Sequence, residues 1–332
     1  SKVEGTGTTS SGNFPAKGIK SASHHTVSGV HATADWEVPA ALAPKAKACP
    51  NPVKNTVQTG KFTSKQAKKI KASKIVNNIV GECRGQLQPI AASMLMRVLY
   101  AARVARFDCL RAVNRLACFV SYWDTDCDRR LHRLMCYINT SLAKRQVGWI
   151  GDPRGDLAPH TYADADYAGC PRTLRSTSGG QLQIEGPHSC FPVAARSIRQ
   201  ACVSCSTPEA ELASMHLAYR SMSIPSLDLW STLLHKQVVG VVHEDNSACI
   251  SVILSGKNPT MKYIGRSQGV NIQFLHELLG LRHASCPHDL IYTRSELMVA
   301  DIHTKPFTEE SKWKHASEMA DVVYMPRLKE LI

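Results

Sequence analysis

Four acidic residues stand at positions where a fold could bring their carboxylates together: Asp164, Glu211, Asp245 and Asp301. Each lies in a different predicted element. Asp164 lies in a strand, Glu211 in the first turns of a helix, Asp245 at the carboxyl end of an apolar strand, and Asp301 in the first turns of a last helix. Ligands gather at the carboxyl ends of strands in sheets covered by helices. Because hard cations such as Mg²⁺ prefer oxygen ligands, these acids form a candidate divalent-cation site.

Short strands must position the first of these acids. Alternation and turn residues predict strands over 161–168, 180–184 and 190–196, close enough in sequence for an antiparallel meander. A helix follows, with Ser206 as its N-cap and Glu209 at N3 in a capping box. Pro225 is expected to break or kink this helix.

The second half of this region alternates strands and helices. An apolar run at 238–242 predicts a strand buried on both faces. The later elements are predicted as helices at 247–254 (closed by Gly256) and 270–279, a strand at 290–292, and a helix capped by Ser295 that runs through Ile302. The order predicts an α/β (α+β) fold, a five-stranded mixed sheet with helices on its faces.

Upstream, apolar residues recur at helical spacing between Pro89 and Val120 and again over 128–138. We interpret residues 87–150 as a helical connector and residues 158–325 as the domain that carries the four acids. Residues 1–80 are rich in Ser, Thr, Gly, Lys and Ala, which favours a mostly disordered tail.

The basic charge is concentrated in that tail. The chain carries a net charge of +13, and residues 1–80 hold twelve lysines, no arginine and only Glu4, Asp35 and Glu37 as acids, so nine of the thirteen positive charges lie there. Such a tail either binds nucleic-acid phosphate or is simply solvated, and the charge pattern leaves both open.

The twelve cysteines are scattered, mostly in apolar or helical contexts, which favours a reducing compartment over a disulfide scaffold. Cys202 and Cys205 form one C-x-x-C without a second pair, so zinc binding is disfavoured. We expect an intracellular location (cytoplasm, virus-like particle or nucleus), no membrane partner, and a fragment of a longer product because the chain begins at Ser1.

Five motifs resemble the ribonuclease H domain of copia-type LTR retrotransposons. They are Tyr162-Ala163-Asp164-Ala165-Asp166-Tyr167-Ala168-Gly169-Cys170, Arg175-Ser176-Thr177-Ser178-Gly179-Gly180, Ser206-Thr207-Pro208-Glu209-Ala210-Glu211, His243-Glu244-Asp245-Asn246-Ser247-Ala248 and Ala300-Asp301-Ile302-His303-Thr304-Lys305-Pro306-Phe307. Each alone is weak, but the five occur in the family's order with sensible gaps.

The resemblance implies a ribonuclease H-like fold and a Mg²⁺-dependent endonuclease that cleaves the RNA strand of RNA–DNA hybrids. It implies two ions (Mn²⁺ can substitute): Asp164 bridges both, Glu211 and Asp245 hold the leaving-group ion, and Asp301 holds the other. Two ions about 3.5–4 Å apart can activate water and stabilise a leaving oxygen. Reading 2′-hydroxyls distinguishes RNA from DNA.

The upstream segments 106–108 and 112–116 resemble the end of the copia reverse transcriptase, so the remainder of that polyprotein is an expected partner. A polymerase needs adjacent aspartates in Tyr-x-Asp-Asp, and no such string occurs, so polymerase activity is not expected. For the hybrid we predict contacts from Arg175, Ser176, Arg199 and Asn246, with ordinary surface charge as the alternative for the arginines.

Neighbouring acids and histidines receive lesser roles. Asp166 shares the strand face of Asp164, Glu209 serves the cap, and Glu244 is expected to point away from Asp245. His243 is expected to pack or hydrogen-bond, and His303 could approach the site.

Two other functions stay open. A catalytically decayed remnant would only bind nucleic acid, as departures such as Phe107 and Gln268-Gly269-Val270 allow. A transposase or integrase would share the fold, but it ends its acidic set with a helical Glu, whereas this chain has Asp301.

Overall fold

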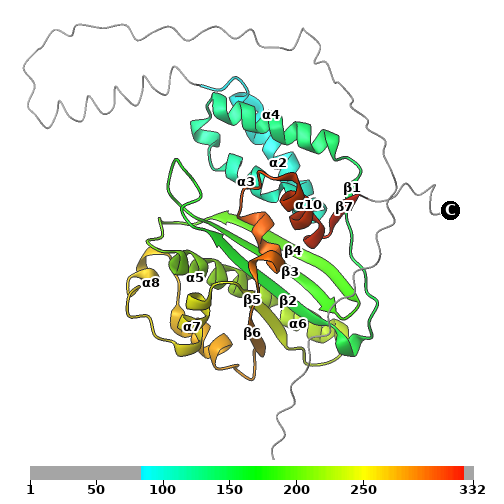
Figure 1. Cartoon of the computed structure of the whole chain (residues 1–332), viewed down its shortest axis with the longest axis vertical. Coiled ribbons are helices and arrows are strands. Elements are labelled where there is room, and N and C mark those ends of the chain that lie inside the picture. The colour runs from blue at the N-terminus through cyan, green and yellow to red at the C-terminus, as the bar shows by residue number, and fades with distance from the viewer. Residues whose placement is uncertain (1–83, 325–332) are drawn as a thin grey trace, which may run out of the picture. The chain divides into compact units, whose positions relative to one another are not determined.

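The computed structural model describes residues 84–324, and its centre is a five-stranded sheet in the order β4-β3-β2-β5-β6 (Figure 1). The strands are β2 (Ala158–Asp166), β3 (Thr177–Gly186), β4 (Ser189–Arg199), β5 (Gly240–Glu244) and β6 (His288–Tyr292). β2 pairs antiparallel with β3 and parallel with β5, and β6 is parallel to β5. The mixed five-stranded sheet with helices on its faces confirms the predicted α/β class.

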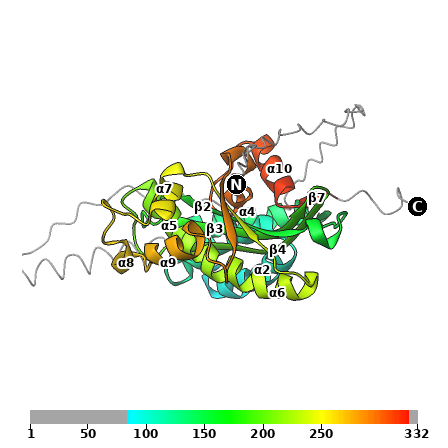
Figure 2. The ribbon, with the colours of Figure 1, turned by 90° about the horizontal axis from the view of Figure 1, so that it is seen from below.

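Helices cover both faces of this sheet. They are α2 (Gln88–Val104), α3 (Leu110–Ala117), α4 (Thr125–Thr140), α5 (Thr207–Ala218), α6 (Ile224–Leu234), α7 (Ser247–Ser255), α8 (Ile264–Ser267), α9 (Ile272–Leu275) and α10 (Glu310–Met319). Figure 2 shows α10 and α6 on opposite sides of the strands. Side chains alternate along β2 as a strand requires, so Tyr162 packs with Met298 and Ala300 while Ala163 packs with the cluster of the other face.

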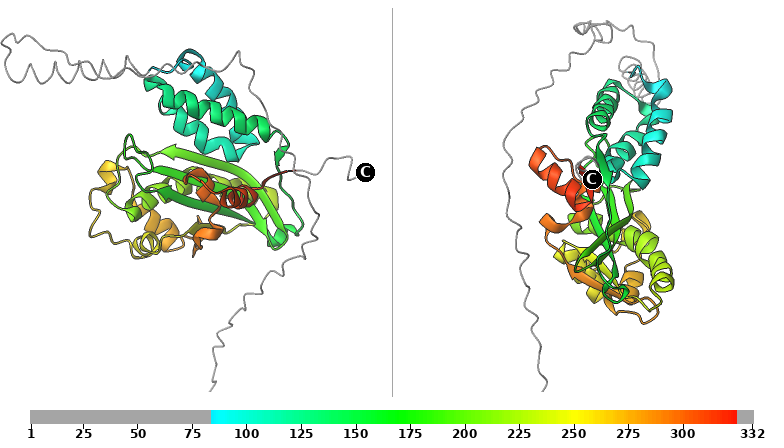
Figure 3. Two further views of the ribbon diagram at one scale, coloured as in Figure 1. Left: turned by 45° about the horizontal axis from the view of Figure 1, so that its top comes forward. Right: turned by 90° about the vertical axis from the view of Figure 1, so that its right-hand side faces the viewer.

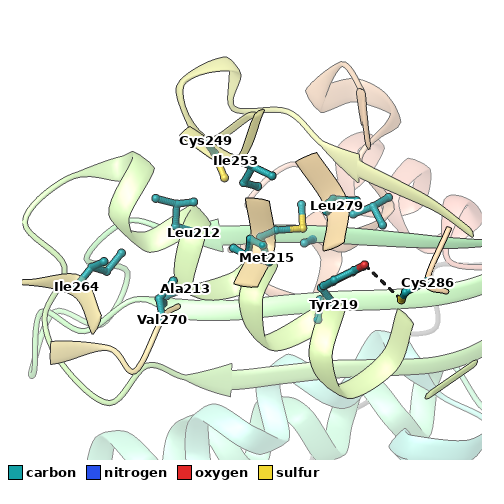
Figure 4. Packing of buried hydrophobic residues seen from close by; sticks show 14 of the residues in the cluster. Leu212, Ala213, Met215, Tyr219, Cys249, Ile253, Ile264, Val270, Leu279 and Cys286 are labelled. Carbon is teal, nitrogen blue, oxygen red and sulfur yellow. Dashed lines mark hydrogen bonds between the residues drawn. The ribbon is translucent and has the colours of Figure 1, made fainter. Parts of the chain in front are cut away.

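The larger of these clusters anchors α5. Leu212, Met215 and Tyr219 are fully buried among residues of the later helices, including Ile253 and Leu279 (Figure 4). The Tyr219 hydroxyl lies 3.6 Å from the Cys286 sulfur, so its polar end is not stranded in the core. Burial of α5 in this cluster fixes the position of its first turns against β2.

A third cluster joins the upstream helices. Leu95 of α2, Val113 of α3 and Leu131 of α4 belong to it, and Ala195 of β4 packs against it. Figure 3 shows these helices beside the sheet. The short strands β1 (Lys144–Gln146) and β7 (Val322–Tyr324) pair antiparallel, so the segment after α4 is tied to the end of the described chain.

Several predicted boundaries were wrong. The helix expected between Pro89 and Val120 is interrupted after Val104 by a short 3₁₀ turn, η1 (Phe107–Cys109), because Arg106 leaves the helical conformation to pair with Asp108. Beyond α5 the chain continues through a π-helical turn, η4 (Tyr219–Ser223), into α6, so the irregularity begins before Pro225.

The predicted helix from Ser295 to Ile302 is two 3₁₀ turns, η6 (Ser295–Leu297) and η7 (Val299–His303). Ser295 does not cap it, because its hydroxyl donates to Asp245 instead. β1, β7 and α10 were not predicted. Gly256 ends α7 with a φ of +63°, as expected. The 1–80 tail lies outside the described residues, and no helix within 84–324 is long and apolar enough to span a bilayer.

Candidate metal centre

Three of the four predicted acids converge at one end of β2. Carboxylate oxygens of Asp164, Glu211 and Asp245 all lie within 4.8 Å of one another. Asp164 and Glu211 are buried, and Asp245 is half-buried. We call these three residues the carboxylate cluster. Asp301 adjoins it through Lys305, whose ammonium lies 2.7 Å from an Asp301 oxygen and 3.4 Å from an Asp164 oxygen.

Asp164 is positioned by close approach of η7 to the sheet. It pairs across the ladder with Gly179, and a Cβ on Gly179 would lie 2.5 Å from the Thr304 methyl carbon and 3.1 Å from the Ala300 carbonyl oxygen. Glycine therefore lets the Thr304 hydroxyl reach and donate to Asp164. The Ser214 hydroxyl of α5 donates to the backbone oxygens of Asp164 (2.6 Å) and Gly179 (3.0 Å), which docks the helix on both strands.

Glu211 is positioned by the start of α5. Ser206 caps this helix as predicted, accepting from the Glu209 amide. The Glu209 carboxylate departs from a simple capping box, because it accepts from the Cys205 amide at 2.8 Å and the Tyr263 hydroxyl at 3.0 Å. These bonds fix the first turn, and Glu211 projects from the next one toward β2.

Asp245 follows β5 directly, as expected from the apolar run before it. Its carboxylate accepts from the Ser295 hydroxyl at 2.6 Å. Ser295 therefore holds the one cluster member that is not buried, and η6 contributes to the site through this contact.

Burial dominates the electrostatics of the site. It raises the pKa of Asp164 and raises that of Glu211 well above its ordinary value, with neighbouring carboxylates adding to the rise in Glu211. Burial and the charge of Asp164 raise the pKa of Asp301 to about 7. The Asp164 and Asp301 carboxylates raise the pKa of Lys305 despite its own burial. Like charges held together out of water are poorly compensated.

The donor set fits a hard divalent cation. All three cluster ligands are carboxylates, which Mg²⁺ and Mn²⁺ accept. The buried Glu211 Oε2 has no hydrogen-bond partner among residues 84–324. A buried polar atom without a partner costs about 1–3 kcal/mol, and a cation between the three carboxylates would remove that cost.

Glu244 was assigned a lesser role and was expected to point away from Asp245. Its side chain is fully buried, and one oxygen accepts from the Asn246 amide at 3.1 Å while the other has no partner in the described chain. Burial and the nearby Asp245 and Asp164 raise its pKa well above the ordinary value. It is therefore a fourth acid electrostatically joined to the carboxylate cluster. Its place in the His243-Glu244-Asp245 motif did not predict this proximity to the cluster.

The predicted substrate contacts are scattered. Arg199 lies at the end of β4 and lines a hollow with Arg111 and Arg115 of α3. Ser176 is fully buried, where its hydroxyl accepts from the Ala168 amide. Asn246 caps α7 through the Cys249 amide. Arg175 is half-buried at the turn before β3. Their roles toward a hybrid stay predictions.

The two histidines near the acids are packed side chains. His243 stacks on Tyr162 with ring centroids 4.0 Å apart and hydrogen-bonds Thr293 at 2.8 Å. His303 is fully buried and lies 2.9 Å from the Gln181 amide oxygen. Burial lowers the pKa of both rings to about 3, so they are neutral near pH 7.

Comparisons with known proteins return solved structures alone. No family model matches the chain, and no curated protein matches it. Ribonuclease H1 from the halophilic archaeon Halobacterium salinarum is similar over 43% of this chain and 90% of its own, with 9% identity and a TM-score of 0.29. The N-terminal ribonuclease H domain of a Mycobacterium tuberculosis protein, solved as a fusion with maltose-binding protein, is similar over 49% and 99%, with 14% identity and a TM-score of 0.27.

Proposed function

We propose that the chain is a Mg²⁺-dependent nuclease that hydrolyses the RNA strand of RNA–DNA hybrids. The observation that carries the proposal is the convergence of Asp164, Glu211 and Asp245 within 4.8 Å, with a buried carboxylate oxygen among them that has no partner in the described part of the chain. Hydrolysis adds a water oxygen to phosphorus and releases an ester oxygen, which takes up a proton. Bound divalent cations supply the Lewis acid for both oxygens.

The acids and their hydrogen-bond partners would have different roles in cation binding. Asp164, Glu211 and Asp245 would hold the cations, with Thr304 and Ser295 orienting two of the carboxylates through hydrogen bonds. Outer partners of this kind keep ligand oxygens in place. Asp301, whose pKa is raised to about 7 even with Lys305 beside it, would ionise fully only as a cation compensates its charge.

The proposal extends to the chain's context. We take residues 158–325 as the ribonuclease H-like domain and residues 87–150 as a connector of the kind that ends a copia-type reverse transcriptase. The remaining polyprotein would then be a partner, and the setting would be retrotransposon reverse transcription. The ordered motifs support this reading, and the hybrid is the substrate that such a setting supplies.

The test is cleavage of an RNA strand, end-labelled and annealed to DNA, by the full chain in Mg²⁺. The parent is compared with Asp245→Asn, which preserves shape and removes a ligand charge. Asp289→Asn is the matched control, because Asp289 is an exposed acid of β6 paired with Arg282. We expect cleavage by the parent and the control and a loss of about 100-fold or more in Asp245→Asn. No cleavage by the parent, or equal cleavage by all three, would refute the proposal.

The alternative is a remnant that binds nucleic acid without cutting it. The segment Ile198-Arg199-Gln200 favours it, because it has one basic residue where the resemblance to copia-type ribonucleases H implies Lys-Lys-Gln, and a ribonuclease needs phosphate contacts as well as metal ligands. Salt-sensitive hybrid binding together with no Mg²⁺-dependent cleavage would select this alternative.

A further inference from the structure

A groove of about 390 Å³ lies between the connector helices and the segment that follows η7. Arg111 and Arg115 of α3 and Arg130 and Arg133 of α4 line one side, and Lys305 lies at its border with the carboxylate cluster. We call this the arginine groove. A second hollow, lined by Arg199, adjoins it, because Arg111 and Arg115 line both.

Positive charge in the arginine groove exceeds its acidic partners. Asp108 is the one acid among its lining residues in the described chain, and it already receives Arg106 and the Tyr137 hydroxyl. Arg130 pairs with Asp126 outside the groove. Within residues 84–324, neither Arg115 nor Arg133 has a carboxylate within 4.0 Å.

The surroundings of α3 also disfavour the charge of one of these arginines. Burial, with the neighbouring Arg115, lowers the pKa of Arg111 to about 10 even though Asp166 lies 4.0 Å away. Guanidinium groups held together without enough counter-charge are a site for an anion, and their planar fork suits phosphate oxygens.

Two features favour a nucleic-acid strand over another anion. The groove borders the carboxylate cluster, since Lys305 lines it and lies 3.4 Å from Asp164. Its remaining wall carries Tyr137, Phe307 and Trp313, half-buried aromatic side chains of the kind that contact sugars or bases. A strand with phosphates on the arginines would therefore lead straight to the metal centre.

We infer that the arginine groove binds the sugar–phosphate backbone of a nucleic-acid strand and guides it to the carboxylate cluster. The identity of the occupant rests on the proposed function. The connector is then part of the substrate-binding surface, and Arg115 and Arg133 are substrate contacts that the sequence motifs did not indicate.

The test measures hybrid binding in a chelator, in an Asp245→Asn background, as salt rises from about 50 to 200 mM. Each phosphate contact contributes about 0.9 to the slope of log affinity against log salt. Arg115→Ala and Arg133→Ala should each reduce that slope by about 1, and the double variant by about 2. Arg220→Ala is the control, because Arg220 is an exposed arginine of η4. The neighbouring Tyr219 of η4 packs in the cluster on the other face of the sheet. The lysines of residues 1–80 are the same in every variant, so differences report the groove.

An unchanged slope in the double variant would overturn the inference. So would an acidic peptide of matched charge that binds as tightly as the hybrid and loses as much affinity in Arg115→Ala. If Arg115→Ala fails to fold, because Arg115 donates to the Gly169 carbonyl, Arg133→Glu at its exposed position carries the test alone. Binding is measured without cleavage, so failure of the nuclease proposal would leave these slopes intact.

Discussion

Two groups of polar side chains are buried along the same strands, and they are treated in opposite ways. At one end of β2, the carboxylate cluster keeps an oxygen of Glu211 that has no hydrogen-bond partner among residues 84–324, and the same holds for an oxygen of nearby Glu244. On the face that α6 covers, His288 lies 2.9 Å from the Ser223 hydroxyl and 3.2 Å from the Tyr219 hydroxyl, and Thr161 donates to Ser223. We call these four residues the histidine network.

The difference indicates that the histidine network stabilises the fold, whereas the carboxylate cluster is arranged for a ligand. In the histidine network each polar group has a partner and none carries charge, because burial lowers the pKa of His288. Such a network holds its neighbours in place at little electrostatic cost. The carboxylate cluster instead accumulates like charge away from water, which a folded chain tolerates where a ligand compensates it. The predictions below alter one group at a time.

The largest expected effect is on cation binding in Asp164→Asn. Asp164 is one of the three carboxylates of the cluster and also contacts Thr304 and Lys305, so the substitution removes one of the three ligand charges. We expect Mn²⁺ affinity, measured by calorimetry, to fall by about 100-fold or more. A matched Asp289→Asn variant should bind like the parent, and undiminished affinity in Asp164→Asn would place the cation elsewhere.

The histidine network should respond in stability. His288→Ala leaves the buried Tyr219 and Ser223 hydroxyls without this partner and opens a cavity between β6 and η4. We expect a loss of about 2–4 kcal/mol in the free energy of unfolding, measured by urea denaturation. Mn²⁺ affinity of the folded variant should be unchanged, and a parallel loss of both would erase the distinction between the regions.

The acidic region should show a pH dependence that Asp301 contributes to. Asp301 has a pKa of about 7 in the folded chain against 3.8 ordinarily, so the folded state holds its proton more tightly. Metal-free stability from this group should therefore fall as pH rises from about 4 to 7, while cation affinity rises over pH 6–8. Melting temperatures in a chelator check the first trend. Asp301→Asn should make it shallower, and a curve identical to the parent's would contradict the assignment.

The smallest effect concerns Lys305, the ammonium that compensates Asp164 and Asp301. Lys305→Met keeps the chain length and removes a charge that opposes a cation. We expect Mn²⁺ affinity to rise several-fold, since a competing positive charge a few ångströms away is lost. Lys312→Met is the control, because that lysine pairs with Glu309 at the surface. Lower affinity in Lys305→Met would show that Lys305 supports the cation site.

Much of this fold could be predicted from the sequence because local rules agree with it. Alternation defined β2, the capping residues defined the start of α5, and Gly256 ended α7. The ends of helices were less accessible. The connector helix ends before Arg106, which pairs with Asp108. The Ser295 hydroxyl does not cap a helix but donates to Asp245, 50 positions away. Contacts of that kind do not register in local periodicity.

The site divides the same way. Asp164, Glu211 and Asp245 were named from motifs, and the fold brings them within 4.8 Å. The role of Glu244 was missed because strand alternation predicts the direction of a side chain and not whether a buried acid lies near other acids. Thr304 and Lys305 lay in a quoted motif without a role, since their contacts with Asp164 cross about 140 positions of sequence.

The most direct measurement of the central claim is anomalous diffraction from crystals of the full chain grown with Mn²⁺. The account predicts manganese peaks within coordination distance of Asp164, Glu211 and Asp245, with Glu211 Oε2 among the ligands. Manganese absent from these three carboxylates, or bound only at other residues, would contradict it.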